Sequence, residues 1–352
     1  MRVVIIGGSG HVGTYLVPRL VEAGHRVVAI SRGKSRPYRS HAAWGQVEQI
    51  AADREGEEAD GSFGRRIAAL RADAVVDMIC FTPESARQLA EALRGEVEHF
   101  LHCGTIWVHG PSVQVPTVEE QPRRPFGSYG VQKAAIEAYL LAEARRRGFP
   151  ATVLMPGHIV GPGWAPLNPQ GHFDPRVFAL LATGEELTLP NLGLETVHHV
   201  HADDVAQSFM AALASRTASV GESFHVVSAA ALTLRGYAEA AAGWFGQQPR
   251  LRYLPWEEWR GTVGEAEANA TWDHIAHSPN CSIAKATRLL GYVPRYTSLQ
   301  AVHESVGWLI EAGQLAAPGW GGAQVVARPA RVRAAAGSRP PDSRHRSART
   351  LR

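Results

Sequence analysis

Tyr129 and Lys133 stand four residues apart inside the segment 128–148, whose residue pattern is typical of a helix. At that spacing both side chains project from one face of a helix. A tyrosine is a poor base at neutral pH because its ordinary pKa is about 10. A neighbouring ammonium favours the phenolate, so we expect Lys133 to lower the pKa of Tyr129 and the pair to move a proton. Thr105 follows the predicted strand 99–103, where its hydroxyl could hold a substrate oxygen beside the phenol.

A glycine-rich turn with the sequence GGSGHVG joins the first predicted strand, 3–8, to the first predicted helix, 11–23. Glycines are needed in such a turn because a Cβ would keep the backbone from approaching a pyrophosphate. The N-terminus of the following helix offers unpaired N–H groups and a partial positive charge. We therefore predict that the turn binds a dinucleotide. The predicted contacts in it are Gly7, Gly10, His11, Val12 and Gly13.

The end of the second predicted strand bears on the identity of that dinucleotide. An NAD site usually has an acid here for the ribose 2′-hydroxyl. This strand ends in Ser31 instead, and Arg32, Lys34 and Arg36 follow. Cations suit a 2′-phosphate through charge-assisted hydrogen bonds, so the sequence favours NADP, with NAD and an ordinary solvated loop as the alternative. Asp53, just after the third predicted strand, is a predicted adenine contact.

Strands and helices alternate along the first half of the chain. Apolar, β-branched strands are predicted at 3–8, 26–31, 47–51, 74–81, 99–103 and 151–155, and helices at 11–23, 63–71, 83–93 and 128–148. Repeated units of this kind build a parallel sheet with helices on both faces. We therefore predict an α/β fold, a doubly wound parallel sheet of the Rossmann type with a smaller C-terminal substrate lobe.

Breaks in this alternation indicate how the chain is divided. Residues 1–160 are predicted to form the dinucleotide-binding domain, and residues 196–228 to return to it. Residues 161–195 and 229–315 lack the regular alternation and are predicted to form the substrate lobe. Residues 316–352 are rich in Ala, Arg, Pro and Ser without an apolar period, so we predict a disordered, arginine-rich tail.

Composition and charge exclude several classes of protein. The chain has 352 residues, of which 45% are hydrophobic and 20% charged, which is typical of folded domains. It has no apolar run of about eighteen residues, so we predict no membrane span. About +7 of its charge lies in residues 318–352, which leaves about −4 on the rest and gives no reason to expect nucleic-acid binding by the folded part. Cys80, Cys103 and Cys281 form no disulfide or metal pattern, which indicates a cytoplasmic location.

The sequence resembles the extended short-chain dehydrogenase/reductase family, which includes NAD-dependent epimerases and dehydratases. The segments that carry the resemblance are GGSGHVG (7–13), CGTIWVHG (103–110), YGVQK (129–133), PGHIVGPG (156–163), HADDVA (201–206) and LLGYVPRY (289–296). The resemblance implies that Tyr129 is the proton donor or acceptor and that Thr105 takes the place of the family's serine or threonine. It implies that Lys133 lowers the pKa of Tyr129 and holds the nicotinamide ribose, while hydride passes between nicotinamide C4 and a substrate carbon.

Further expectations follow from the same resemblance. We predict cofactor contacts by Cys80 and Phe81, in the segment 74–81, and by Pro156 and His158, just past the strand 151–155. The family often dimerises through the helix that carries the tyrosine, so a homodimer is expected.

Departures from the family pattern narrow the reaction. Sugar 4,6-dehydratases carry an acid pair directly after the catalytic threonine, whereas this chain has Ile106 and Trp107, so that dehydration is not expected. Sugar epimerases usually show an arginine and an asparagine where this chain has Met155 and His158. The usual tyrosine of their V-Y-G segment is His109 here. These departures leave open a substrate other than a nucleotide sugar.

A histidine-rich segment raises the question of a metal site. His198, His199 and His201 are followed by Asp203 and Asp204, and imidazole and carboxylate groups bind zinc or iron. The acids precede an apolar helix, however, so one of them is more simply its N-cap. In a strand, His199 and His201 would point one way and His198 the other. We therefore predict no metal site.

Trp164, His172 and Phe173 flank the Pro/Gly-rich stretch after the last regular strand. They are candidates for a substrate pocket at the carboxyl edge of the sheet, with packing between lobes as the alternative.

The sequence predicts an enzyme, an NAD(P)-dependent oxidoreductase or epimerase that acts on a secondary alcohol or ketone. The expected substrate is a sugar or sugar-like small molecule, with Tyr129 as acid and base. The alternative is a non-catalytic dinucleotide-sensing or RNA-binding protein on the same scaffold. Such relatives often lose the tyrosine or the lysine, and this chain has both Tyr129 and Lys133.

Overall fold

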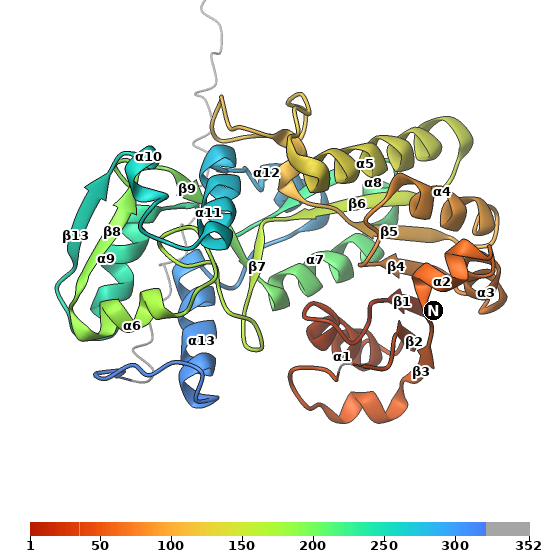
Figure 1. Ribbon diagram of the computed structural model, residues 1–352. Helices are drawn as coiled ribbons and strands as arrows, with labels where there is room; N and C mark the ends of the chain where they lie inside the picture. Colours follow the sequence, from red (N-terminus) through yellow and green to blue (C-terminus); the bar gives the residue numbers. More distant parts are fainter. Residues whose placement is uncertain (35, 322–352) are drawn as a thin grey trace, which may run out of the picture. The chain divides into compact units, whose positions relative to one another are not determined.

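A seven-stranded parallel sheet forms the centre of the computed structural model, which describes residues 1–34 and 36–321 (Figure 1). In spatial order its strands are β3 (Glu48–Ala51), β2 (Arg26–Ser31), β1 (Arg2–Ile6), β4 (Ala74–Asp77), β5 (His99–Cys103), β6 (Ala151–Pro156) and β11 (Ser223–Val226). The chain starts in the middle of the sheet, builds outward to β3, and then continues from β4 on the other side of β1. This order confirms the predicted doubly wound, Rossmann-type fold. It places the reversal of strand order beside β1, where such sheets bind ligands.

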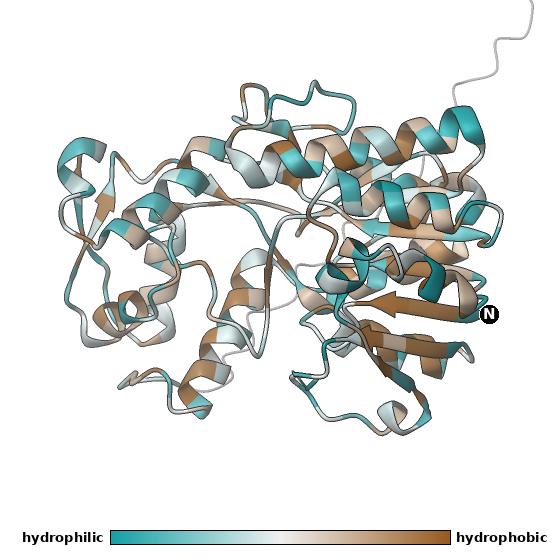
Figure 2. Cartoon of the chain, turned by 45° about the vertical axis from the view of Figure 1, so that its right-hand side comes forward, coloured by the Kyte–Doolittle hydropathy of each residue, from teal (hydrophilic) through white to brown (hydrophobic). Residues whose placement is uncertain are grey.

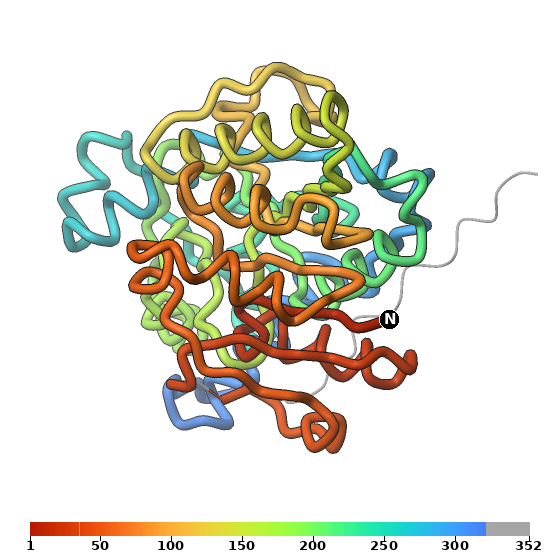
Figure 3. The backbone as a smooth tube through the Cα atoms, turned by 90° about the vertical axis from the view of Figure 1, so that its right-hand side faces the viewer, coloured from red at the N-terminus to blue at the C-terminus, as the bar shows by residue number. Residues whose placement is uncertain are grey.

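Helices cover both faces of the sheet because both faces of its strands are apolar. In β1, Val4 and Ile6 belong to one cluster of buried side chains, and Val3 and Ile5 belong to another, which is the two-residue period of a strand. Figure 2 shows the hydrophobic strands between helices, and Figure 3 shows α4 and α5 side by side on one face. The first cluster includes residues of α3 (Phe63–Ala69), α4 (Pro83–Ala92) and α5 (Gly127–Arg147), and the second those of α1 (Gly13–Glu22), α7 (Ala202–Ala214) and α12 (Ala284–Leu290).

A third cluster of buried side chains, with Phe178, Leu187, Tyr237 and Val302 among them, lies outside the central sheet. It includes residues of α6 (Arg176–Thr183), α9 (Leu234–Trp244), α13 (Ser298–Glu311) and β8 (Glu186–Pro190). Partly buried residues of β13 (Arg250–Leu254), which pairs with β8 in parallel, pack against it. Two smaller pairs join β7 (His158–Val160) to β10 (His199–His201) and β9 (Thr196–Val197) to β12 (Leu232–Thr233). The remaining helices are α2 (Arg54–Ala59), α8 (Arg216–Ser219), α10 (Trp256–Trp259), α11 (Glu265–His277) and the 3₁₀ turns η1 (Ala42–Gln46) and η2 (Ile106–His109). The boundaries proposed for the two lobes stay a prediction.

Two strands are shorter than their apolar runs predict. The run at 3–8 forms a strand only to Ile6, because Gly7 turns the chain with a φ of +89°. The run at 74–81 forms a strand only to Asp77, which pairs with Ile6 at the end of β1. Beyond Asp77, β4 no longer has β1 beside it, because β1 ends at Ile6. Cys80 and Phe81 therefore lie in the loop after β4 and not on the strand.

The N-cap of α7 is His201, which corrects the prediction that Asp203 or Asp204 caps this helix. Nδ1 of His201 accepts a hydrogen bond from the main-chain N–H of Asp203 at 3.0 Å. Both carboxylates have partners elsewhere. Asp203 accepts from Nε of Arg19 at 2.9 Å, and Asp204 accepts from the main-chain N–H of Arg295 at 2.7 Å.

Residues 322–352, which make up most of the predicted disordered tail, lie outside the described residues. Within the part of the chain that is described, no helix is both long enough and apolar enough to cross a membrane.

Candidate active site

Thr105, Tyr129 and Lys133 come together in one cavity of about 460 Å³. Cys103, the last residue of β5, and Pro156, the last residue of β6, also line it, so the cavity lies at the carboxyl end of the sheet. Tyr129 and Lys133 come from the first two turns of α5. The three residues predicted to be catalytic therefore share a single site at the edge where doubly wound sheets bind ligands.

Thr105 is held in place by the turn that follows β5. The N–H of Gly104 donates to the carbonyl of Leu154 in β6 at 2.7 Å, which ties the turn to the sheet. The Thr105 side chain then caps η2 by accepting from the N–H of Trp107 at 3.3 Å. The same side chain lies beside Tyr129 and favours the ionised form of its hydroxyl. Thr105 is thus buried, fixed by its neighbours and in contact with the phenol.

Lys133 is buried, and its ammonium has well-defined partners. Its Nζ donates to the main-chain carbonyls of Cys80 and Cys103, each at 2.8 Å. These carbonyls belong to the loop after β4 and to the end of β5, so Lys133 joins two neighbouring segments at the carboxyl edge. The ammonium also lies 4.8 Å from the ring centroid of Phe81 and 5.9 Å from that of Tyr129.

Burial sets the acidity of Tyr129. Burial, with a smaller contribution from Cys103, raises the pKa of Tyr129 to about 12, and the nearby Thr105 side chain only partly opposes this. The expectation that Lys133 lowers this pKa is therefore wrong for this structure. The ammonium is engaged by two carbonyls, and burial lowers the pKa of Lys133 itself. Tyr129 is consequently a neutral phenol at neutral pH, which is the form that donates a proton.

A second cavity, of about 560 Å³, is lined by four residues predicted to bind the cofactor: Ser31, Arg32, Asp53 and Phe81. Because Phe81 also lines the catalytic cavity, the two cavities share this side chain. Arg32 is exposed and has no ion pair among the described residues. By contrast, Arg54 of the same cavity donates to both carboxylate oxygens of Asp77, at 2.7 and 3.1 Å. Arg32 is therefore a cation that remains available to a ligand in this cavity.

The glycine turn has the shape and the donors that a pyrophosphate needs. A Cβ on Gly13 would lie 2.0 Å from the carbonyl oxygen of Gly8, so the tight turn tolerates no side chain there. In the described chain, α1 begins with no side chain capping it and no acid in its first turn. The N–H groups at its N-terminus thus lack a side-chain acceptor, and such groups bind phosphate oxygens. The turn therefore fits the predicted dinucleotide.

His11 of this turn is packed between two aromatic side chains. Its ring centroid lies 5.5 Å from that of Tyr38 and 4.4 Å from that of Trp164. Trp164 donates from Nε1 to the hydroxyl of Tyr38 at 2.9 Å, so the loops after β2 and β7 are bridged beside the turn. Burial, with His201 nearby, lowers the pKa of His11 to about 4, which leaves the ring uncharged at neutral pH.

The other residues predicted to contact the cofactor differ in how they reach the site at the carboxyl edge. Pro156 and His158 line the catalytic cavity. Burial, with His274 and two other histidines nearby, holds the pKa of His158 well below its ordinary value. The Cys80 thiol is buried and contacts the carbonyl of Thr82 at 3.6 Å, so Cys80 meets the site through its own carbonyl, which Lys133 binds.

A group of three potential metal ligands lies beneath the site. Asp77, Cys80 and His102 are buried, and their ligand atoms lie within 4.8 Å of one another. Arg54 already occupies both carboxylate oxygens of Asp77. Burial, with Asp77 nearby, raises the pKa of Cys80 to about 12, which disfavours the thiolate that binds metals. The absence of a metal stays a prediction.

Aromatic residues and one helix complete the wall of the catalytic cavity. Trp164 and Phe173 line it, as two of the three predicted pocket residues, whereas His172 lines a separate cavity. Sequence reasoning did not assign three further lining residues to the site: Trp107 of η2, and Asp273 and His274 of α11. Only the tertiary structure brings α11, far along the chain, to the cavity. The position of Trp107 just after Thr105 was the one available signal.

Comparisons with known proteins place this geometry in a family. The family described as "NAD dependent epimerase/dehydratase family" matches residues 3–226. The chloroplast stem-loop binding protein of 41 kDa b from Arabidopsis thaliana is 26% identical over 312 residues, which cover 86% of this chain and 78% of that protein. The 2′-dehydrokanamycin reductase of Streptomyces kanamyceticus is 27% identical over 337 residues, which cover 95% and 91%.

A solved structure agrees with the fold. UDP-glucose 4-epimerase from Thermotoga maritima, crystallised with UDP-glucose, matches with a TM-score of 0.68 and 20% identity over 89% of this chain and 99% of that chain. The segment matched by the family, residues 3–226, includes the glycine turn and also Thr105, Tyr129 and Lys133. The resemblance seen in the sequence is thus confirmed, and the chain belongs to the NAD-dependent epimerase/dehydratase family of enzymes.

Proposed function

We propose that the protein is an NADP(H)-preferring oxidoreductase that interconverts a ketone and a secondary alcohol of a sugar-like small molecule, with Tyr129 as acid and base. The observation that carries the proposal is that Thr105, Tyr129 and Lys133 line one cavity, which adjoins the nucleotide cavity at Phe81. It gives a proton donor, a second hydroxyl to hold the substrate oxygen, and a place for the cofactor.

The bound nicotinamide would supply the hydride that adds to the carbonyl carbon of the substrate. Tyr129 donates its hydroxyl proton to the carbonyl oxygen, which becomes the alcohol. Thr105, which lines the same cavity, would hold the substrate oxygen beside that hydroxyl. The phenolate left behind must regain a proton from solvent before the next turnover.

Reduction is the direction that uses the neutral form of Tyr129. A phenol with a pKa of about 12 is protonated at neutral pH and ready to donate, whereas oxidation needs the phenolate. The relative from Streptomyces kanamyceticus is named a reductase and aligns with 95% of this chain. Epimerisation uses the same residues but returns the hydride to the opposite face, and it is the alternative within this family.

The cofactor is assigned to the edge that runs from the glycine turn to Lys133. Gly7, Gly10, His11, Val12 and Gly13 would hold the pyrophosphate at the start of α1. Arg32 and Ser31 would take a 2′-phosphate, which supports NADP over NAD, and Asp53 would contact the adenine. Lys133 and the loop residues Cys80 and Phe81 would hold the nicotinamide ribose and ring, together with Pro156 at the end of β6 and His158 at the start of β7.

Location and assembly are further parts of the proposal. The three cysteines are free and buried, which suits the reducing cytoplasm. A homodimer would pack through α5, where Val131 is 49% exposed. Sedimentation of the purified protein tests this, because Val131→Glu should shift a dimer toward monomer.

Nucleic-acid binding on the same scaffold has one observation in its favour, the name of the relative from Arabidopsis thaliana. Against it, this chain has both Tyr129 and Lys133, and both line the catalytic cavity. The enzyme is therefore the proposal that the geometry supports best.

The deciding experiment supplies NADPH deuterated at C4 together with a panel of ketones and follows the label. A reductase places the deuterium in the alcohol product and releases oxidised cofactor. An epimerase keeps its cofactor through gel filtration and releases none. Tyr129→Phe should lower the turnover number by about a hundredfold or more while changing cofactor affinity less than about twofold.

Tyr139→Phe is the matched control, because Tyr139 lies on the same helix α5 but does not line the catalytic cavity. It should keep wild-type turnover. Full activity of Tyr129→Phe would overturn the proposal.

A further inference from the structure

Among the residues that the structure describes, none gives the catalytic cavity a free positive charge. Among the described residues, the lining side chains that carry a formal charge are Lys133 and Asp273. The Lys133 ammonium is buried and donates to the carbonyls of Cys80 and Cys103, each at 2.8 Å. Asp273 is exposed on α11 and adds a negative charge to the wall. A phosphate group would therefore meet an acid and no available cation.

The two histidines that line the catalytic cavity add no positive charge to it. His158 is held uncharged by burial, which keeps its pKa well below the ordinary value. Burial lowers the pKa of His274 to about 4, and its Nδ1 lies 2.6 Å from the carbonyl of Ala270. Both rings are neutral at neutral pH, so neither provides the imidazolium that would attract an anion.

Aromatic side chains make up much of the remaining wall. Trp107 stacks on His277 with 4.2 Å between ring centroids, which fixes its orientation, and Trp164 and Phe173 are each partly exposed. Flat apolar surfaces of this kind bind the apolar face of a ring or chain. The cavity thus combines hydroxyls at its reacting end with aromatic surfaces around them.

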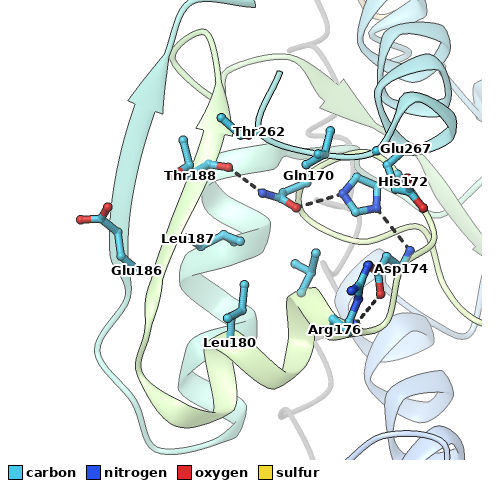
Figure 4. A pocket seen from close by; sticks show the side chains of 13 residues that line it. Gln170, His172, Asp174, Arg176, Leu180, Glu186, Leu187, Thr188, Thr262 and Glu267 are labelled. Carbon is cyan, nitrogen blue, oxygen red and sulfur yellow. Dashed lines mark hydrogen bonds and ion pairs between the residues drawn. The ribbon is translucent and has the colours of Figure 1, made fainter. Parts of the chain in front are cut away.

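The neighbouring cavity, of about 490 Å³, is acidic (Figure 4). It shares a wall with the catalytic cavity, because the consecutive residues His172 and Phe173 line one each. Its one arginine among the described lining residues, Arg176, is tied to Asp174, with Nε donating to Oδ2 at 2.6 Å. Glu186 and Glu267 also line it and have no ion pair among the described residues.

His172 also has its hydrogen-bonding atoms occupied within this acidic cavity. Its Nδ1 accepts from the main-chain N–H of Asp174 at 3.2 Å, so Nε2 carries the proton and donates to Oε1 of Gln170 at 2.9 Å. The Gln170 amide in turn donates to the carbonyl of Thr188 at 2.7 Å. This chain of hydrogen bonds, drawn in Figure 4, uses the groups that could otherwise have bound a phosphate.

We propose that the substrate of the catalytic cavity is a phosphate-free alcohol or ketone, neutral or positively charged, whose apolar face rests on Trp107, Trp164 and Phe173. This inference rests on the proposed function, since it assigns a substrate class to the same site. It separates the chain from enzymes that hold a nucleoside diphosphate, because neither cavity has a free cation for one among the described residues.

Calorimetric titration of the protein saturated with NADP⁺ tests the inference directly. The probes are UDP-glucose and dihydroxyacetone phosphate, and we expect each to bind with a Kd weaker than about 1 mM. A Kd tighter than about 1 mM for either probe, at ordinary ionic strength, would overturn the inference.

Two variants at one position show whether charge is the cause. Asp273→Arg should bind UDP-glucose about tenfold more tightly than wild type, and Asp273→Asn should fall between them. If the wild type and both variants bind UDP-glucose with equal affinity, the electrostatic argument is wrong. This holds even if that affinity is weak.

The outcome is independent of the proposed oxidoreductase activity. Tight UDP-glucose binding together with deuteride transfer that depends on Tyr129 would overturn the substrate class alone. Failure of the protein to bind NADPH, or full activity of Tyr129→Phe, would overturn the proposed function whatever the titration shows.

Discussion

The ammonium of Lys133 lies 5.9 Å from the ring centroid of Tyr129, while its hydrogen bonds go to the carbonyls of Cys80 and Cys103. The lysine four residues after the tyrosine thus fastens the loop after β4 to the end of β5. Lys133 therefore acts first as a positioning residue, because these two segments line the cavity in which we expect the phenol and the cofactor to lie side by side.

Lys133→Met should destabilise the protein and also lower activity. It would leave two buried carbonyls without a donor, and we expect a loss of about 2 kcal/mol in the free energy of unfolding. Urea unfolding measures this. Lys285→Met is the control, since Lys285 pairs with the partly exposed Glu222 at 2.8 Å and should cost less than about 1 kcal/mol. Equal losses for the two variants would contradict the structural role of Lys133.

The pH dependence of the reaction should follow the raised pKa of Tyr129. Because that pKa is about 12, the phenol stays protonated, and able to donate, throughout the neutral and moderately alkaline range. Titration of Tyr129 should therefore leave the rate of ketone reduction unchanged between about pH 6 and pH 10. Alcohol oxidation needs the phenolate and should rise with pH over the same interval. A reduction rate that falls with a midpoint near neutrality would show that the phenol is more acidic than the structure indicates.

Arg32→Ala should separate the two dinucleotides. Arg32 lines the nucleotide cavity without an ion pair among the described residues, so its loss removes a charge-assisted contact to a 2′-phosphate. We expect the Kd for NADPH to rise about 10- to 100-fold and the Kd for NADH to change less than about twofold, measured by fluorescence titration. Arg36→Ala is the control, because Arg36 lines a different cavity. Equal losses for NADPH and NADH would contradict the assignment of NADP.

Tyr38→Phe should speed the release of the cofactor. The variant keeps the ring that packs on His11 but removes the acceptor of the Trp164 hydrogen bond, which is 2.9 Å long. A net hydrogen bond is worth about 1 kcal/mol, so dissociation should become about fivefold faster in stopped-flow fluorescence. Tyr253→Phe, on β13 and distant in sequence from the turn, is the control. An unchanged release rate would mean that the bridge between Tyr38 and Trp164 does not hold the cofactor.

Local features of the chain were sufficient to predict the fold class and six of the seven strands of the central sheet. The apolar runs at 26–31 and 99–103 became β2 and β5, and Thr82 caps α4 through Ser85, because propensity, burial and capping act over a few residues. The glycine pattern was equally informative, since Gly7 needs its positive φ and Gly13 has no room for a Cβ.

The charge state and the substrate wall of the site depended on contacts between segments that are distant in the sequence. Sequence spacing placed Lys133 beside Tyr129 but did not show that two carbonyls would engage its ammonium. It also did not show that burial would raise the pKa of the phenol to about 12. Asp273 and His274 reach the cavity only because α11 packs there. The sequence determined which residues could do chemistry, through local pattern. Tertiary structure decided their protonation and charge balance, because burial and electrostatic interactions depend on distances in space.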